Sequence, residues 1–373
     1  MTKSHNEGFR VEPNKPLASL TTMGVGGLAE HYTIVETRDD IAFALNWARS
    51  KHLPLWVLSG GSNLIVADEG LSGLVVDLRL GGVKYATNQG NSVVATVAAG
   101  EDWDRFVAAT VGFGYSGLEC LSGIPGRVGA TPIQNVGAYG QDVSQTICHV
   151  EVLDRESGEI SQFEAADCEF GYRTSRFKNR QTERYIIVSV CFRLSLAPPA
   201  VPNHVELLRQ LTLQHAPNPT VQDVRTAVLS LRKSKSMLLD PADPCSRSCG
   251  SFFVNPVLSS NVADTLRTRF DTERVPLYPQ SSGGVKIAAA WLIEKAGFRR
   301  GHRDGRVGLS EKHSLAIVAE ANATARDVVL LARTIQKNVL DTFGVLLQPE
   351  PIFWGYARMR QGLPVLEFER TPR

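Results

Sequence analysis

Two glycine-rich loops constrain this chain more than any other feature. The first is Ser59-Gly60-Gly61-Ser62-Asn63, and the second begins at Gly123-Ile124-Pro125-Gly126 and runs through Gln134-Asn135 to Gly140. Each follows an apolar run. Because glycine carries no side chain, the backbone N–H groups of such loops can gather around an anion. Taken singly, either loop also fits a tight turn. Two of them in one half of a chain predict a large ligand with a diphosphate, held from two sides.

The first half of the chain alternates helical and strand patterns. Apolar residues from Ile41 to Ala48 fall at helical spacing behind Asp39-Asp40, which suit a first helical turn. The apolar run Leu55–Leu58 predicts a strand that delivers the first glycine loop, and Leu64–Val66 predicts a strand that leaves it. A second helix is expected to carry Trp103, Phe106 and Val107. Further strands are expected over residues 74–78, 93–97, 148–153, 159–163 and 185–194.

A third glycine pattern, Gly112-Phe113-Gly114-Tyr115-Ser116-Gly117, matches the GxGxxG dinucleotide fingerprint. That fingerprint has a mechanism only where it leaves a strand and opens a helix. Here it follows the helical pattern of residues 105–110 and precedes proline-glycine turns. We therefore interpret it as a loop, and the chain is not expected to have a Rossmann fold.

The second half has a different character. Residues 195–218 are rich in proline and polar residues, which predicts a linker or an ordered loop. Helices are expected over 221–233, over 288–296, and from a capping box at Thr324 and Asp327 to Thr342, with Gly344 as the stop. The apolar run Val345–Leu347 predicts a last strand that returns to the first domain.

Charge and composition exclude several classes of protein. The formal net charge is only +2, and no apolar run approaches the roughly 20 residues that span a bilayer. Neither nucleic acid nor membrane is therefore expected as a partner. The polar start, Met1–Gly8, lacks the apolar core of a signal peptide, so a cytoplasmic protein is expected. The six cysteines are scattered, and Cys245 and Cys249 have no further ligands nearby, so reduced thiols and no metal site are expected.

Three short segments each present one reactive group among residues that restrain it. In Gly171–Lys178, three cations, among them Arg173, surround Tyr172, although a solvated basic turn would look the same. In Ser248–Pro256, Ser251 stands between a glycine and two phenylalanines, which also fits a turn into a core strand. In Gln348–Pro351, two prolines stiffen Glu350, which alone also fits a surface loop.

Together, the glycine loops and these segments resemble the UDP-N-acetylenolpyruvoylglucosamine reductase (MurB) family. The matching motifs are YRxSxFK at 172–178, GSFFxNP at 250–256 and the proline-glutamate pair at 349–350, in family order. Thr21–Gly27 looks like the family's TxxxGG entry segment, and Arg232–Ser236 resembles its basic helix end. The resemblance runs from about Thr21 to about Phe353, nearly the whole chain.

The resemblance implies an α+β fold. Its parts would be a two-lobed FAD-binding domain of the PCMH/vanillyl-alcohol-oxidase type and a C-terminal α+β substrate-binding domain. The expected boundaries are 18–197 for the flavin domain and 198–220 for an inter-domain loop. They are 221–343 for the substrate domain and 344–373 for a C-terminal segment that returns to the active site. A monomer is expected.

The resemblance also implies the reaction, which is NADPH-dependent reduction of UDP-N-acetylglucosamine enolpyruvate to UDP-N-acetylmuramate for peptidoglycan synthesis. Arg173 would polarise the substrate carboxylate, which suits a permanently charged bidentate group. Glu350 would share that task, and Ser251 would donate a proton to the enol. Flavin would contact the two loops through Ser59, Gly60, Gly61, Ser62, Asn63, Gly123, Ile124, Pro125, Gly126, Gly129, Ala130 and Gln134. The first loop has no histidine, where related oxidases often attach flavin covalently, so non-covalent FAD is expected.

Substrate-binding positions implied by the resemblance are Tyr172, Lys235 and Asn255. Lys235 would assist Ser251 or bind the UDP phosphates. Family members with a long inter-domain loop carry a tyrosine there that closes over the substrate. Residues 195–218 contain no tyrosine, and His204 is the nearest candidate for its place. Two other functions stay open, a different flavin oxidoreductase such as a sugar or alcohol oxidase, and a non-catalytic UDP-sugar-binding regulator.

Overall fold

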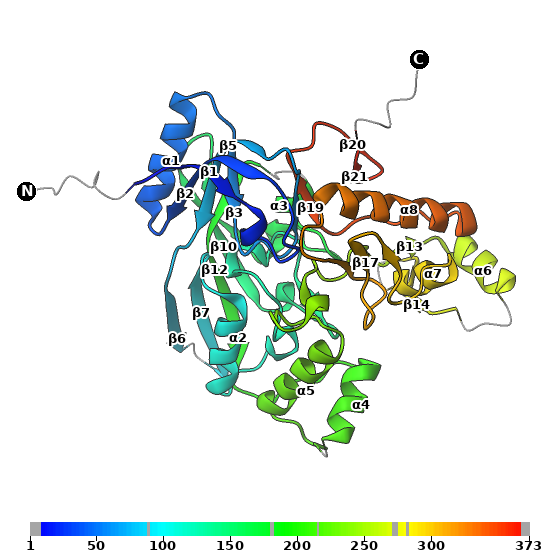
Figure 1. The fold of residues 1–373 in the computed structure, drawn as a ribbon. Coiled ribbons are helices and arrows are strands. Elements are labelled where there is room, and N and C mark those ends of the chain that lie inside the picture. The colour runs from blue at the N-terminus through cyan, green and yellow to red at the C-terminus, as the bar shows by residue number, and fades with distance from the viewer. Residues whose placement is uncertain are drawn as a thin grey trace, which may run out of the picture. The chain divides into compact units, whose positions relative to one another are not determined.

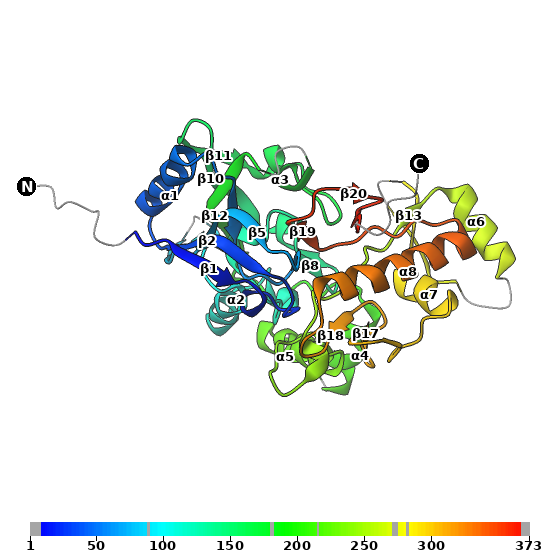
Figure 2. The ribbon, with the colours of Figure 1, turned by 45° about the horizontal axis from the view of Figure 1, so that its top comes forward.

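The computed structural model describes residues 9–87, 90–179, 183–214, 216–270, 275–280 and 283–366 (Figures 1 and 2). The polar start, Met1–Gly8, and the last seven residues of the expected C-terminal segment lie outside the described residues. By its internal contacts the chain divides into two compact units. Among the described residues, the first comprises those within 9–15, 29–61 and 72–238, and the second those within 16–28, 62–71 and 239–366.

The first unit contains two main sheets. One has four strands in the order β1-β2-β5-β3, and the other has five in the order β11-β10-β12-β7-β6 with every neighbouring pair antiparallel. Their bounds are β1 Glu12–Pro16, β2 Leu28–Val35, β3 Leu55–Leu58, β5 Leu71–Leu78, β6 Val83–Thr87, β7 Ser92–Ala98, β10 Ile147–Asp154, β11 Ile160–Glu164 and β12 Tyr185–Ser195. A small pair is formed by β8 Gly137–Ala138 and β9 Gln141–Asp142. The helices are α1 Arg38–Ser50, α2 Trp103–Gly112, α3 Arg176–Asn179, α4 Val205–Leu213 and α5 Val221–Ser234.

Helices α1 and α2 confirm the helical patterns of the first half. A capping box between Thr37 and Asp40 begins α1, and its Ile41, Ala44, Leu45 and Ala48 are buried. Helix α2 packs on the five-stranded sheet through Trp103 and Phe106, whose rings lie 6.0 and 5.4 Å from that of Phe192. Because α2 ends at Gly112, the GxGxxG match is a loop after a helix, as predicted.

The expected loop over 198–220 contains helix α4, which the sequence analysis missed. Leu207 and Leu211 are four residues apart, lie on one face of α4 and are buried against Val224 and Val228 of α5. Helix α5 lies in the first unit, whereas the sequence analysis placed it at the start of the substrate domain. The physical reason is this apolar face, which α5 buries against α4 and Cys120. The assignment of 18–197 to flavin and of 221–343 to substrate stays a prediction.

The second unit is built around its longest helix. The helices are α6 Ser260–Arg269, α7 Ala289–Lys295 and α8 Ala325–Phe343. The strands are β4 Leu64–Val66, β13 Val257–Leu258, β14 Leu277–Pro279, β15 Val285–Ile287, β16 Arg303–Asp304, β17 Val307–Leu309, β18 Ile317–Ala319, β19 Ile352–Trp354, β20 Met359–Arg360 and β21 Leu363–Pro364. Helix α8 lies beside α7 in both views and buries Val328, Leu331 and Ile335 in the core (Figures 1 and 2). The predicted capping box at Thr324 and Asp327 begins α8, and Gly344, with φ 67°, ends it.

The prediction of a strand over Val345–Leu347 is wrong. Those residues belong to no strand, and Val345 and Leu347 are buried in the core that α8 covers. The pairing strand comes later, where β19 runs parallel to β4 with Ile352 opposite Leu64. A short apolar run has the same composition in a strand and in a buried loop, so its sequence could not distinguish the two.

The cysteines are unpaired, and the part of the chain that the structure describes contains neither a membrane-spanning helix nor a metal cluster. All six cysteines are free thiols, and five of them are buried. Within the described ranges, no helix is long and apolar enough to cross a bilayer. The same ranges contain no group of three His, Cys, Asp or Glu side chains that could hold a metal ion.

Candidate active site

The two glycine-rich loops meet in the first unit. A Cβ atom placed on Gly60 would lie 2.5 Å from the Cα of Gly126 and 3.0 Å from its carbonyl carbon. Both atoms belong to the backbone and cannot turn aside as a side chain would. The approach of the two loops therefore requires glycine at position 60. Left-handed φ angles of 60° at Gly61, 72° at Gly123 and 124° at Gly126 make glycine the natural residue there as well.

One side of the second glycine loop is held by charged groups of α2 and α5. Asp104 accepts the backbone N–H of Gly123 at 2.5 Å and pairs with both terminal nitrogens of Arg225 at 2.7 and 2.9 Å. Burial alone would raise the pKa of Asp104, but the bonds from Arg225 and Gly123 hold the pKa below its usual range. The carbonyl of Gly123 accepts from Arg232 Nε at 3.1 Å. Both polar groups of the Gly123 backbone are thus satisfied by side chains.

A second charged cluster holds the loop just after Gly126. Arg127 donates to the buried carboxylate of Asp77 at 2.6 Å, and Asp77 also accepts from Tyr32 and Arg79, each at 2.7 Å. The backbone N–H of Trp103 donates to the Gly126 carbonyl at 3.0 Å. Asp77 lies in β5, which pairs with β3, the strand that leads into the first loop. The sequence analysis missed Asp77, because a lone aspartate in an apolar strand carries no recognisable motif.

FAD fits the first unit by two observations. Where Gly60 faces Gly126, the two loops present backbone without side chains, and a Cβ on Gly60 would fill the space between them. The hydroxyl oxygen of Ser59 is buried and has no hydrogen-bond partner within the protein, which is a costly state that a polar ligand would relieve. Gly129 and Ala130 lie in a 3₁₀ turn over Val128–Ala130, where a Cβ on Gly129 would meet Ala99 at 2.6 Å. Ile124 packs against the core, and Pro125 and Gln134 are half-buried.

The turn that carries Tyr172 and Arg173 is tied to the continuation of the second loop. The Arg173 guanidinium donates to the carbonyl of Gly137 at 2.6 Å and to that of Asn135 at 3.5 Å. The Asn135 amide in turn donates to the Gly171 carbonyl at 3.0 Å. Arg173 has a φ of 56°, which is rare for a residue with a side chain and marks a constrained position. The Tyr172 ring is 44% exposed, with the guanidinium of Arg173 5.5 Å from its centre.

In the second unit, backbone hydrogen bonds bring the serine and glutamate segments together. The N–H of Glu350 donates to the Phe252 carbonyl at 2.8 Å, and the N–H of Val254 donates to the Gln348 carbonyl at 2.9 Å. Phe252 and Phe253 are buried, so they anchor the segment and leave Ser251 half-buried at its start. The structure thus places Ser251 and Glu350 on two adjacent extended segments.

Asn63 of the first glycine loop joins the same group. Its side-chain amide donates to the Glu350 carbonyl at 3.1 Å, and its own carbonyl accepts from Ile352 at 2.9 Å. Ser62 and Asn63 belong to the second unit, while Ser59, Gly60 and Gly61 belong to the first. The chain therefore passes from one unit to the other within the first glycine loop.

A histidine that the sequence analysis did not consider lies beside Ser251. The Ser251 hydroxyl and His313 Nε2 are 3.3 Å apart, within hydrogen-bond distance. His313 lies in the turn between β17 and β18, and the Leu315 carbonyl of that turn accepts the Phe252 N–H at 2.7 Å. No local motif marks His313. Only the fold brings it to the serine.

Of the other predicted substrate-binding residues, Lys235 and His204 lie in the first unit and Asn255 lies in the second. Lys235 pairs with Glu206 at 2.6 Å in the first unit. His204 precedes α4 and packs edge-on against Tyr139 of the second glycine loop, with ring centres 5.2 Å apart. Burial lowers the pKa of His204, and its Nδ1 is buried without a hydrogen-bond partner in the protein. In the second unit, Asn255 Oδ1 accepts the Ala289 N–H at 2.9 Å at the start of α7, so part of its amide has a structural role.

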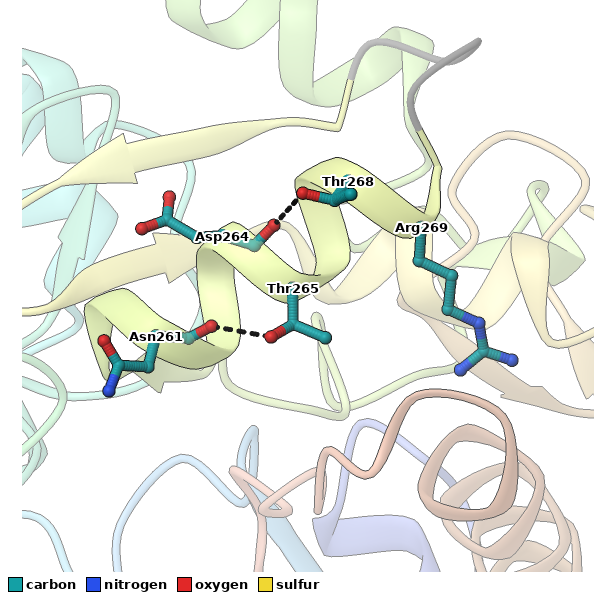
Figure 3. A pocket seen from close by; sticks show the side chains of 5 residues that line it. All are labelled: Asn261, Asp264, Thr265, Thr268 and Arg269. Atoms are coloured by element: carbon teal, nitrogen blue, oxygen red, sulfur yellow. Dashed lines mark hydrogen bonds between the residues drawn. The ribbon is translucent and has the colours of Figure 1, made fainter.

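A surface depression on α6 contains none of these residues. Its lining is Asn261, Asp264, Thr265, Thr268 and Arg269 (Figure 3). The two threonine hydroxyls donate to helix carbonyls, Thr265 to Asn261 at 2.9 Å and Thr268 to Asp264 at 3.0 Å. The depression is open to solvent and offers no cluster of reactive groups. It therefore does not compete with the site described above.

Comparison with known proteins finds two family models that match this chain. A family model described as an FAD binding domain matches residues 29–164, which include both glycine loops. A family model described as the C-terminal domain of UDP-N-acetylenolpyruvoylglucosamine reductase matches residues 240–354, which include Ser251, His313 and Glu350.

Whole-length relatives carry the same name. The UDP-N-acetylenolpyruvoylglucosamine reductase of Thermobifida fusca is 46% identical over 92% of this chain and 97% of its own length. That of Salinispora arenicola is 44% identical over 90% of this chain and 93% of its own. Among solved structures, UDP-N-acetylenolpyruvylglucosamine reductase (MurB) from Thermus caldophilus is similar with a TM-score of 0.62 and 26% identity. That match covers 93% of this chain and 99% of the Thermus protein.

Proposed function

We infer what this chain does from its family, since it belongs to the UDP-N-acetylenolpyruvoylglucosamine reductases. It is an FAD-dependent oxidoreductase that reduces UDP-N-acetylglucosamine enolpyruvate to UDP-N-acetylmuramate in peptidoglycan precursor synthesis. NADPH is the hydride donor, in keeping with the family's reaction. The fold class predicted from the sequence, an FAD-binding domain followed by a C-terminal α+β domain, is confirmed.

We propose that FAD is held by backbone groups of the two glycine loops. Ser59, Gly60, Gly61, Ser62 and Asn63 would bind it from the first loop, and residues Gly123–Gly126, Gly129, Ala130 and Gln134 from the second. The unpartnered Ser59 hydroxyl and the bare contact of Gly60 with Gly126 support this assignment. When bound and reduced, FAD supplies hydride to the β-carbon of the enol ether.

Arg173 polarises the substrate carboxylate in this proposal. Hydride can add to the alkene only if the negative charge that builds up on the carboxylate is stabilised, and a guanidinium does this with two parallel N–H donors. The constrained backbone of Arg173 and the hydrogen bonds from its guanidinium to the carbonyls of Asn135 and Gly137 support an ordered side chain. Such order is what a charge aimed at a transition state requires.

Ser251 donates the proton to the α-carbon, and Glu350 shares the stabilisation of the carboxylate. The single observation that carries this pairing is the hydrogen bond from Glu350 N to Phe252 O at 2.8 Å. It places the proline-restrained carboxylate and the serine on neighbouring segments of one unit. Tyr172, Lys235, Asn255 and His204 are proposed to contact the substrate, with His204 in place of the closing tyrosine.

The protein is further proposed to be a cytoplasmic monomer with non-covalent FAD. Acid or heat should release intact FAD into the supernatant, because only non-covalent contacts would hold it. Flavin that stays with the precipitated protein would contradict non-covalent binding.

Turnover of the purified protein tests the function directly. We expect the flavin absorbance spectrum and oxidation of NADPH that begins only when the enolpyruvyl sugar is added. An oxidase would instead consume oxygen with a sugar or alcohol and need no NADPH. A sugar-binding regulator would bind the nucleotide sugar and leave NADPH unchanged. The UDP-N-acetylmuramate product, identified by mass spectrometry, completes the assignment.

A further inference from the structure

We propose that His313 is a positioning residue that supplies Ser251 with the proton that the serine passes to the substrate. The inference rests on the proposed role of Ser251 as proton donor. Its observation is the 3.3 Å separation of Ser251 Oγ and His313 Nε2 in the second unit. No predicted site residue other than Ser251 is involved in that contact.

The first argument concerns the acidity of serine. A serine hydroxyl is a weak acid, and releasing its proton leaves an alkoxide that is costly unless a donor faces it. Of the two possible orientations of this hydrogen bond, only Nε2–H donating to Oγ stabilises the alkoxide. The reverse orientation would direct the serine proton toward the imidazole and away from the substrate. Proton donation by Ser251 therefore requires a protonated Nε2 on His313.

The second argument concerns order. The turn that carries His313 is closed by bonds from Ala316 N to His313 O at 3.1 Å and from Ser310 N to Ala316 O at 2.9 Å. Its Leu315 carbonyl binds the residue after Ser251, so the histidine turn and the serine segment are fixed to each other through the backbone. Outside the backbone, Lys312 of the same turn is tied to Asp243 at 3.0 Å. The two side chains are thus prearranged for transfer.

The proton steps balance. The Oγ–H bond of Ser251 breaks as a C–H bond forms at the α-carbon, with the electron pair coming from the hydride-reduced enolic substrate. The Nε2–H bond of the His313 imidazolium then breaks as its proton moves to Oγ, which restores the serine hydroxyl and leaves a neutral imidazole. The neutral imidazole regains a proton from water, since histidine exchanges protons readily near neutral pH. Neither step of the relay oxidises or reduces the protein.

The experiment separates the two half-reactions by stopped-flow absorbance of the flavin. His313→Ala should leave reduction by NADPH within about twofold of wild type and slow reoxidation by the enolpyruvyl sugar roughly 10²-fold, the lower range for a general acid. His313→Gln keeps an N–H donor without a titrating group, so its reoxidation rate should fall between the two. His302→Gln is the matched control, because that histidine packs on Phe298 at 5.1 Å and should leave both rates unchanged.

Chemical rescue identifies proton supply as the cause. Added imidazole should restore part of the reoxidation rate of His313→Ala, and more acidic substituted imidazoliums should restore more. Reoxidation of His313→Ala at the wild-type rate would overturn the proposal, as would equal slowing of both half-reactions or rescue independent of acidity. Should the alanine variant misfold, His313→Gln at the wild-type rate would overturn it equally. Wild-type protein that the sugar fails to reoxidise would instead reject the proposed function itself.

Discussion

The backbone N–H of Glu350 donates to the carbonyl of Phe252 at 2.8 Å, and this bond joins two segments that are distant in the sequence. Beside it, the Asn63 amide donates to the Glu350 carbonyl at 3.1 Å, and the Ser251 hydroxyl lies 3.3 Å from His313. Four stretches of the chain therefore meet in one unit around a serine and a carboxylate.

Gly60→Ala should abolish or strongly weaken FAD binding. The added methyl would lie 2.5 Å from the Gly126 Cα, so the two loops would have to move apart. The matched control is Gly112→Ala at the end of α2, where a Cβ meets nothing within 4 Å. Flavin fluorescence titration of the apoproteins measures both affinities. Wild-type affinity in Gly60→Ala would show that the contact of the loops does not form the flavin site.

Asp77→Asn should loosen the second glycine loop and weaken FAD binding, because Arg127 loses its charged partner. Burial raises the pKa of Asp77, but the bonds from Arg79 and Tyr32 and the charge of Arg127 outweigh it, and the net pKa is lowered. A lowered carboxyl pKa adds stability that is present above the unfolded-state pKa and is lost as pH falls through the folded-state pKa. Denaturant unfolding of the two apoproteins across acidic pH should therefore show a smaller loss of stability for Asp77→Asn. Parallel curves would contradict the charge argument.

Arg173→Lys should lower turnover by roughly 10²-fold while leaving FAD bound. Lysine keeps the positive charge but lacks the planar fork that grips a carboxylate at two points, and loss of one transition-state donor costs about this much. Arg176→Lys is a matched control in the same turn, since Arg176 donates to the Asp167 carbonyl at 2.7 Å and stacks on Phe163. Steady-state NADPH oxidation measures both. Near-normal turnover of Arg173→Lys would mean that Arg173 belongs to a solvated basic turn and does not polarise the substrate.

Ser251→Ala should leave flavin reduction by NADPH almost intact, because that step needs no proton for an enol. Reoxidation by the enolpyruvyl sugar should slow by roughly 10²–10⁴-fold, or about 3–5 kcal/mol in the barrier. Ser251→Cys should recover part of the rate, since a thiol can still give a proton. Ser259→Ala, an exposed serine before α6, is the control. Equal slowing of both half-reactions would make Ser251 part of the flavin pocket, and no slowing would mean that another group is the acid.

Local signals in the sequence predicted the parts of the fold that neighbouring residues decide. Thr324 and Asp327 cap α8 as expected, because the two side chains satisfy N–H groups only three residues away. The glycine loops were recognisable because bare backbone is a local property. The same local reasoning failed for Val345–Leu347 and for α4. In both cases burial against α8 or α5, and not the segment's own pattern, decided the conformation.

The sequence by itself determined the family and named Arg173, Ser251 and Glu350 as candidates, since each lies in a motif of consecutive residues. It could not determine which groups face them, because a hydrogen bond between distant segments leaves no trace in either segment alone. Only the tertiary structure brought His313 to Ser251, Asn63 to Glu350 and Asp77 to Arg127. Each of these contacts depends on buried strands and turns whose packing is a property of the whole unit, and that packing is what positions the side chains for chemistry.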